Sequence, residues 1–305
     1  MSILQQYKES LKTVEAEEIF DLLIFRPLAF IFVKITYGLD FLTPNLVSVI
    51  AMAFGVSAGI MFGFGIAQYL IYGAALYFLC NTLDCADGQI ARLKHNGTKV
   101  GRIVDGFIDY VVSTAVFIGI GIGLSHQSEL MPLSFRGNIF NINSVVHIWM
   151  ITVLAGISSA VQAFMFDFYR NKFLEIVHGK FSSLEDEINE YKQELERIER
   201  EPDKAGFLDS LLIKIYLMYS GLQLKLQKSK HKDGSYIKPN SKVYYMQNKL
   251  LLRLWSFIGS TTHITICLVC ALFNNLELFL LICILPLNLL MAFLYLAQSK
   301  VNSRA

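Results

Sequence analysis

The sequence predicts an all-α integral membrane protein. Of its 305 residues 54% are hydrophobic and only 17% are charged, which is more apolar surface than a soluble domain of this length requires. The apolar residues also gather in long uninterrupted runs, and residues 41–83 contain no charged side chain at all. A helix of ~20 apolar residues crosses the hydrocarbon core of a bilayer. We therefore expect a bundle of transmembrane helices.

The N-terminal segment precedes these runs and has a different character. It is apolar, but Asp21, Arg26, Lys34 and Asp40 interrupt it, so an interfacial amphipathic helix fits better than a membrane span. The chain does not begin with a basic stretch followed by an apolar one, and no cleaved signal peptide is expected. Residues 1–42 are assigned to a cytoplasmic N-terminus and this interfacial helix.

Six apolar runs follow that are long enough to be transmembrane helices. Thr43 is expected as the N-cap of the first helix and Pro44 as its first residue. The expected spans are residues 46–66, 69–92, 101–124, 145–168, 254–273 and 278–298. Residues 43–168 thus hold the first four spans, and residues 253–305 hold the last two with a short tail.

A polar insert separates the fourth span from the fifth, at residues 169–252. Within it Leu184, Ile188, Tyr191, Leu195 and Ile198 recur at alternating four- and three-residue steps, which is typical of a short coiled-coil stripe. A helical hairpin that packs on itself is the simplest interpretation, and a dimer contact or a lid is the alternative. The balanced charges of the insert argue against nucleic acid as a partner.

The distribution of Lys and Arg predicts how the helices are oriented. Basic residues gather between the second and third spans, in the insert and after the sixth span, whereas the other connections are poor in them. Cytoplasmic loops of membrane proteins carry such an excess. Both termini, the insert and the end of the second span should therefore face the cytoplasm, at the cell membrane if the chain is bacterial or archaeal.

Four aspartates stand out against this apolar background. Asp84 and Asp87 are three residues apart near the end of the second span, so they share one face of a helix. Asp105 and Asp109 are four residues apart near the start of the third span and share a face in the same way. Two helices joined by a short turn are antiparallel neighbours, and we expect the two acidic faces to meet.

Small residues accompany the aspartates on both helices. Gly88 and Ala91 continue the face of the second span, and Gly101 precedes Asp105 by one turn. Glycine is costly inside a helix unless something large must approach the backbone closely. Arg92 follows directly and is well placed to meet a phosphate group.

The chemistry of four clustered carboxylates points to metal ions. Without cations the groups would repel one another and resist desolvation. Hard oxygen donors suit Mg²⁺, Mn²⁺ or Ca²⁺, and four carboxylates are enough for two ions about 4 Å apart, as in phosphoryl-transfer enzymes. A hairpin with merely solvated acids and a cation- or proton-coupled transporter are the alternatives. A transporter would place its acids near the bilayer midplane and in both halves of the chain, whereas these lie at one edge and in one half.

The spacing of these residues resembles the signature of the CDP-alcohol phosphotransferase (CDP-alcohol phosphatidyltransferase) family, D-x2-D-G-x2-A-R-x8-G-x3-D-x3-D. Eight positions match it: Asp84, Asp87, Gly88, Ala91, Arg92, Gly101, Asp105 and Asp109. The resemblance extends more loosely to the Thr43-Pro44-Asn45 start of the first span and to the six-span layout. It does not cover the insert.

The resemblance implies a role for each acidic residue. Asp84, Asp87 and Asp105 would bind the metals, which are two Mg²⁺ or Mn²⁺ ions. Asp109 would complete the metal site and act as general base on the acceptor hydroxyl. The reaction would be attack of an alcohol on the β-phosphorus of a CDP-alcohol, with release of CMP.

The resemblance also implies how the substrates and partners bind. Gly88, Ala91 and Gly101 would let the CMP moiety lie against the helices, with Arg92 near the phosphates. The partners would be a CDP-alcohol donor, an alcohol acceptor, membrane lipids and a second copy of the chain in a homodimer.

The sequence leaves the substrates open. The donor is either CDP-diacylglycerol, with a soluble alcohol as acceptor, or a soluble CDP-alcohol that transfers its head group. Candidate acceptor or phosphate contacts are Arg170, Lys172 and Arg253, although positive charge at a membrane edge also explains them. A non-catalytic membrane scaffold is the remaining alternative, and the complete signature argues against it.

Overall fold

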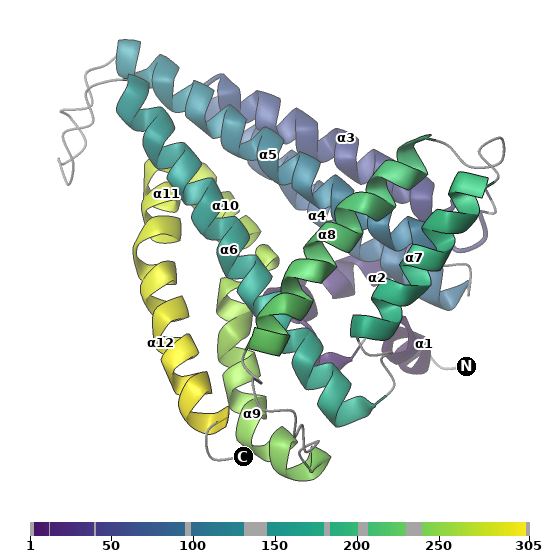
Figure 1. The fold of residues 1–305 in the computed structure, drawn as a ribbon. Coiled ribbons are helices and arrows are strands. Elements are labelled where there is room, and N and C mark those ends of the chain that lie inside the picture. The colour runs from purple at the N-terminus through teal and green to yellow at the C-terminus, as the bar shows by residue number, and fades with distance from the viewer. Residues whose placement is uncertain are drawn as a thin grey trace.

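The fold consists of helices throughout the part of the chain that the structure describes. The structure is a computed structural model (Figure 1). It describes residues 3–11, 13–39, 41–94, 99–130, 145–179, 184–200, 207–229 and 240–302. Every regular element in these ranges is a helix, as the sequence predicts.

The N-terminal segment forms a series of short helices. These are α1 (Ile3–Ser10), a 3₁₀ turn (Val14–Ala16), a π-helical turn (Asp21–Phe25) and α2 (Arg26–Thr36). On α2, Ala29 and Val33 are buried where the helix packs against α4 (Ala67–Leu93), while Ile31 and Ile35 are exposed. The expected helix is thus present and has a buried and an exposed face. Its position at a membrane surface stays a prediction.

The first long helix, α3 (Pro44–Gly63), begins as the sequence predicts. Thr43 has an extended backbone, and its hydroxyl oxygen accepts a hydrogen bond from the Leu46 N–H at 3.3 Å. Pro44 is the first helical residue, where its missing N–H costs nothing. The predicted N-cap is therefore confirmed.

Helix α3 packs against both of the helices that carry the aspartates. It packs against both α4 and α5 (Lys99–Leu130), and the three lie side by side in Figure 1. A Cβ atom on Gly119 would overlap the carbonyl oxygen of Gly59, so the backbones of α3 and α5 touch there. The sequence predicts α4 and α5 as direct neighbours. Among the described residues each packs mainly against α3 instead, which sets the angle at which the acidic faces meet.

The fourth helix is longer than the sequence predicts. Helix α6 runs from Val145 to His178, ten residues beyond the expected end of the span at Phe168. Its last turns therefore belong to the region predicted as the insert. At 1.5 Å per residue this helix is ~51 Å long and exceeds the hydrocarbon core.

Two helices of the insert form the hairpin that the sequence predicts. Helices α7 (Leu184–Arg200) and α8 (Phe207–Ser229) pack side by side (Figure 1). The apolar stripe of α7 contributes Tyr191 and Ile198, which pack with Leu212 and Ile213 of α8.

The C-terminal helices differ from the two straight spans that the sequence predicts. Helix α9 (Ser241–Trp255) and a 3₁₀ turn (Ser256–Ile258) are bent by 42° from α10 (Ser260–Leu272). The expected fifth span over residues 254–273 therefore contains a break, because the chain turns at Ser256–Gly259. Helices α11 (Leu276–Ile284) and α12 (Pro286–Asn302) follow, separated by Leu285 at a proline that lacks an N–H.

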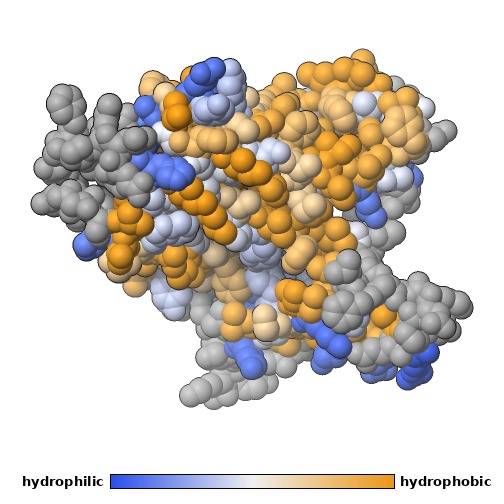
Figure 2. Space-filling view, turned by 90° about the horizontal axis from the view of Figure 1, so that it is seen from above, coloured by the Kyte–Doolittle hydropathy of each residue, from blue (hydrophilic) through white to orange (hydrophobic). Residues whose placement is uncertain are grey.

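Several of these helices are suited to a membrane. Four described segments are long and apolar enough to span one, at Pro44–Gly63, Ile103–Gln127, Val145–His178 and Leu276–Val301, and the bent pair of α9 and α10 would make five. Helix α4 is outside this set. Figure 2 shows a face that is largely apolar, with hydrophilic residues gathered in small patches. Several apolar helices and this surface fit an integral membrane protein.

Candidate metal centre

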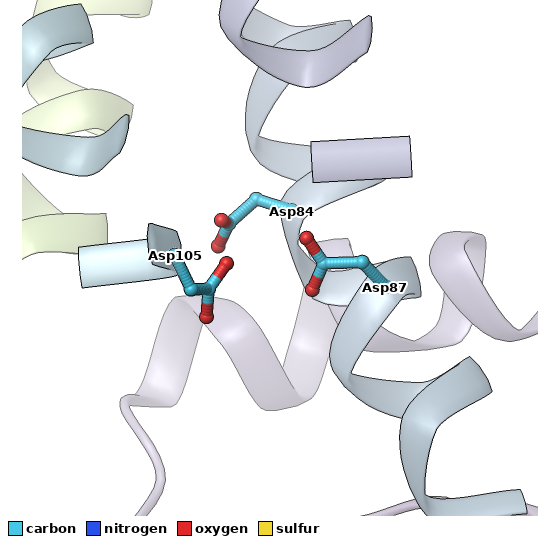
Figure 3. Close-up of side chains that lie close together, drawn as sticks. All are labelled: Asp84, Asp87 and Asp105. Atoms are coloured by element: carbon cyan, nitrogen blue, oxygen red, sulfur yellow. The ribbon is translucent and has the colours of Figure 1, made fainter. Parts of the chain in front are cut away.

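Three of the four aspartates come together where α4 and α5 approach each other. One carboxylate oxygen from each of Asp84, Asp87 and Asp105 lies within 4.8 Å of the others. In Figure 3 the three side chains point toward a common space, two from α4 and one from α5. Asp87 is buried, with 3% of its surface exposed, and the other two are half-buried. We call this group the acid trio.

Helix α3 contributes a fourth residue that the sequence did not point to. The buried hydroxyl of Ser48 donates a hydrogen bond to the Asp87 carboxylate. Ser48 lies one turn after Pro44, at the start of a helix whose position the Thr43 cap fixes. A hydroxyl that occupies one oxygen of Asp87 leaves the other oxygen to face the rest of the trio. No local pattern could reveal this pair, because 39 residues separate its members.

Asp109 lies one turn beyond Asp105 on the same face of α5. Its charge acts on Tyr77 and Cys80 of α4, so its carboxylate lies toward that helix. It is not one of the three carboxylates within 4.8 Å of one another. Its expected roles as metal ligand and general base therefore stay predictions.

Arg92 lies against Gly88 in the last turns of α4. A Cβ atom on Gly88 would be 3.3 Å from Nη1 and 3.4 Å from Nη2 of Arg92. The Arg92 Nε donates to the carbonyl oxygen of Ser10 at 2.5 Å, while the buried Nη2 has no hydrogen-bond partner in the described structure. The arginine is thus held at the end of α1 with one donor unused. Ala91 and Gly101 are half-buried at the neighbouring ends of α4 and α5.

A second group of charged residues lies in the N-terminal segment and was not predicted as a group. Arg26 and Glu17 form an ion pair of 2.8 Å, with 8% and 7% of their side chains exposed. The amide of Gln89 on α4 donates to the Arg26 carbonyl oxygen at 3.0 Å, which ties the pair to the acid-bearing helix. We call Glu17, Glu18, Asp21 and Arg26 the N-terminal ionic network.

Glu18 and Asp21, the other two acids of this network, have raised pKa values because they are buried. Burial, and then the charge of Asp21, raises the pKa of Glu18 well above its ordinary value. Burial also raises the pKa of Asp21, although the charge of Arg26 opposes it. The Glu18 carboxylate accepts a hydrogen bond from the Thr262 N–H at 3.2 Å, in the first turn of α10. A carboxylate at a helix N-terminus is favoured by the helix dipole.

The three predicted acceptor contacts have separate positions. Arg170 on α6 forms an ion pair of 2.8 Å with Asp167. Arg253 on α9 donates to the carbonyl oxygens of Glu17 at 3.0 Å and Val14 at 2.6 Å, and so holds the N-terminal segment in place. Lys172 is half-buried on α6. Their roles toward an acceptor stay predictions.

The acid trio fits a divalent metal ion. Its donors are carboxylate oxygens only, which is the ligand type of Mg²⁺ and Mn²⁺ and not of structural zinc. Carboxylates this close repel one another, so the arrangement is favourable when a cation lies among them.

Comparison with known protein families gives a match that covers the helices around the acid trio. Residues 41–181 match the family described as CDP-alcohol phosphatidyltransferase. The match contains all eight signature positions and the acid trio, from α3 to the end of α6. It excludes the N-terminal ionic network and the helices from α7 onward. None of the curated proteins compared with the chain matches it.

Proposed function

We propose that the chain is a transferase of substituted phosphate groups that moves such a group from a CDP-alcohol to an acceptor hydroxyl, because residues 41–181 match the CDP-alcohol phosphatidyltransferase family. In the proposed reaction the acceptor oxygen forms a bond to the β-phosphorus. The bond from that phosphorus to the bridging oxygen breaks, CMP leaves with that oxygen, and the acceptor hydroxyl loses its proton. The acid trio within the family match is the observation that carries this proposal.

The acidic residues would divide the work in this reaction. Asp84, Asp87 and Asp105 would hold two Mg²⁺ or Mn²⁺ ions, and Ser48 would fix the orientation of Asp87. When bound, such ions neutralise the charge that develops on phosphate oxygens. Asp109, one turn from the trio, would take the proton from the acceptor hydroxyl.

The donor would lie along the small residues at the ends of α4 and α5. Ala91 and Gly101 would let the cytidine and ribose lie close to the backbone, and at Gly88 they would lie beside the Arg92 guanidinium that packs there. The unused Nη2 of Arg92 would donate to a phosphate oxygen, which supplies the acceptor that this buried group lacks. An arginine is suited to this contact because its guanidinium is charged near pH 7 and can donate two hydrogen bonds to one phosphate.

The setting would be a membrane that makes its own lipids. We propose that α4 is also a span, which gives six in total with α9 and α10 taken together, and that the site and both termini face the cytoplasm. Helix α2 would lie at the membrane surface, and the chain would form a homodimer. These proposals rest on the apolar helices, the distribution of Lys and Arg, and the family match.

The test is CMP release by the purified full chain in lipid, with Mg²⁺ or Mn²⁺. The donors would be CDP-diacylglycerol and soluble CDP-alcohols, and the acceptors would be inositol, inositol phosphate, glycerol phosphate, serine and diacylglycerol. We expect release with one class of pair and loss of release on chelation. Release with CDP-diacylglycerol would assign phosphatidyl transfer, and release with a soluble donor would assign head-group transfer. Silence with every pair, from folded protein that binds metal, would contradict the proposal.

A further inference from the structure

The insert helices pack directly on the part of α5 that carries an aspartate of the trio. Helices α7 and α8 lie outside the family match. Ile103 of α5 is buried with Tyr191, Leu212 and Ile213 of the insert, and it lies two residues before Asp105. Helix α8 contacts α5 (Figure 1). The insert therefore borders the proposed active site, although the family match does not include it.

Tyr219 is the residue through which α8 reaches the neighbourhood of Asp109. Its ring meets the ring of Phe164 on α6 edge-on, with centroids 5.4 Å apart. Its hydroxyl lies 3.4 Å from the Asp167 carboxylate, to which it donates, and hydrogen-bonds to Tyr110, the residue after Asp109. Gln223 of the same helix donates to the Tyr219 oxygen at 3.2 Å. Tyr219 thus connects α5, α6 and α8 at one point.

Two charged side chains act on Tyr219 in the described structure, Asp167 and Arg170. Arg170 is paired with Asp167, and it also feels the charges of Glu18 and Glu17. Burial, and then the charge of Asp167, raises the pKa of Tyr219, so the phenol stays neutral near pH 7. A neutral phenol beside a compensated ion pair recognises hydroxyl groups by hydrogen bonds and offers little to a phosphate.

Open space lies on α5 between this group and the acidic face. At 3.6 residues per turn Gly106 projects between Asp109 and Tyr110. A Cβ atom on Gly106 would meet no other atom within 4 Å. Tyr110 is itself 56% exposed, so the hydroxyl chain that begins at Tyr219 is accessible from this side. An alcohol could enter here with one hydroxyl toward Asp109 and another toward Tyr219.

We propose that α8 forms the acceptor-side wall of the active site and that Tyr219 selects the acceptor, which is a polyhydroxy alcohol without charge where it meets this wall. The inference rests on the proposed transfer reaction. It assigns to the insert the task of choosing the acceptor, whereas the matched domain holds the metals and the donor. The attacking hydroxyl faces Asp109, and a second hydroxyl of the same alcohol replaces the Tyr110 link to Tyr219.

The experiment measures CMP release with the full chain in lipid for the wild type, Tyr219→Phe and Met218→Ala. The phenylalanine keeps the ring against Phe164 and removes only the hydroxyl, so α8 stays docked. Met218 is the preceding residue of α8, is 74% exposed and serves as the matched control. The acceptors are inositol, inositol phosphate, glycerol, glycerol phosphate and a single-hydroxyl alcohol, and both substrates are varied to separate KM from kcat.

We expect Tyr219→Phe to raise the acceptor KM about three- to tenfold, the range for one neutral hydrogen bond. The donor KM and kcat should stay within about twofold, Met218→Ala should equal the wild type, and selectivity for the polyol over the single-hydroxyl alcohol should fall. An unchanged acceptor KM and selectivity would overturn the role of Tyr219, as would a joint loss of kcat and donor affinity. A wild type that prefers a phosphorylated acceptor would overturn the acceptor class. No CMP release by the wild type would refute the proposed reaction itself.

Discussion

The acid trio and the N-terminal ionic network are two groups of carboxylates on neighbouring parts of the fold, and their charges are compensated differently. The network places Glu17 against Arg26 at 2.8 Å, with Asp21 beside the same arginine. The trio places three carboxylates within 4.8 Å of one another. A buried carboxylate matched by an arginine is needed for folding because its removal leaves an unpaired buried charge, whereas carboxylates gathered together are suited to a metal. We therefore expect the N-terminal ionic network to support folding and the acid trio to bind metal. Each of the following substitutions tests one of these two roles.

The largest expected effect is on the trio. Asp87→Asn removes one proposed metal ligand and leaves the Ser48 hydroxyl with a neutral acceptor in place of a carboxylate. The substitution should lower the rate of CMP release by about a thousandfold or more. Thermal unfolding of the metal-free protein in detergent should not fall to lower temperature, because the substitution removes one of three carboxylates that repel one another. Asp186→Asn, an exposed aspartate on α7, is the control and should keep full activity. Loss of folding without loss of activity per folded molecule would make the trio structural.

Asp109 sharpens the comparison within the site. Asp109→Asn should lower kcat by about a hundred- to ten-thousandfold, the usual range for loss of a general base. Metal binding should be largely spared, because the asparagine stands outside the trio. Near-normal turnover in this variant would remove Asp109 from the proton transfer.

The N-terminal ionic network should respond in the opposite way. Glu17→Gln leaves the buried charge of Arg26 without its ion-pair partner and should lower the free energy of unfolding by about 3 kcal/mol. Glu196→Gln breaks a largely exposed pair with Arg200 and should cost less than about 1 kcal/mol. Urea or thermal unfolding in detergent measures both, and equal effects would show that the network is not a buried structural pair.

The smallest effect is a pH dependence that belongs to Glu18. Its raised pKa means that the folded state keeps the proton to higher pH than the unfolded chain does. Stability should therefore fall as pH rises from about 4, the ordinary pKa of a glutamate, toward the folded pKa. Glu18→Gln retains the contact with the Thr262 N–H and lacks this loss. The free energy of unfolding of the variant should therefore rise relative to that of the wild type as pH increases above about 4. If the two free energies change with pH in parallel, the pKa of Glu18 is not raised.

The acid trio was predicted from the sequence because it depends on the spacing of aspartates within single helices. Asp84 and Asp87 share a helix face by their spacing, and the same periodicity places Asp105 on α5. The start of α3 was predicted for the same reason, since Thr43 and Pro44 act within a single turn. The hairpin of α7 and α8 follows from the repeat of Leu, Ile and Tyr along one helix face.

The parts that the sequence did not predict depend on long-range contacts. Arg253 binds the carbonyl oxygens of the N-terminal segment from 236 residues away, and nothing in its own segment indicates that partner. The bend before α10 is another case, because apolar residues continue through it. A Cβ atom on Gly259 would overlap the carboxylate of Glu18, so the turn is shaped by a residue from the start of the chain. The greater length of α6 was missed because hydropathy marks the end of a membrane core and not the end of a helix.

The most direct test of the account is a Mn²⁺ titration of the purified full chain, followed by electron paramagnetic resonance. We expect the wild type to bind two ions, Asp87→Asn to lose at least one of them, and both Asp109→Asn and Glu17→Gln to retain binding while folded. Equal Mn²⁺ binding by the wild type and Asp87→Asn would contradict the claim that the acid trio is the metal centre of a phosphotransferase.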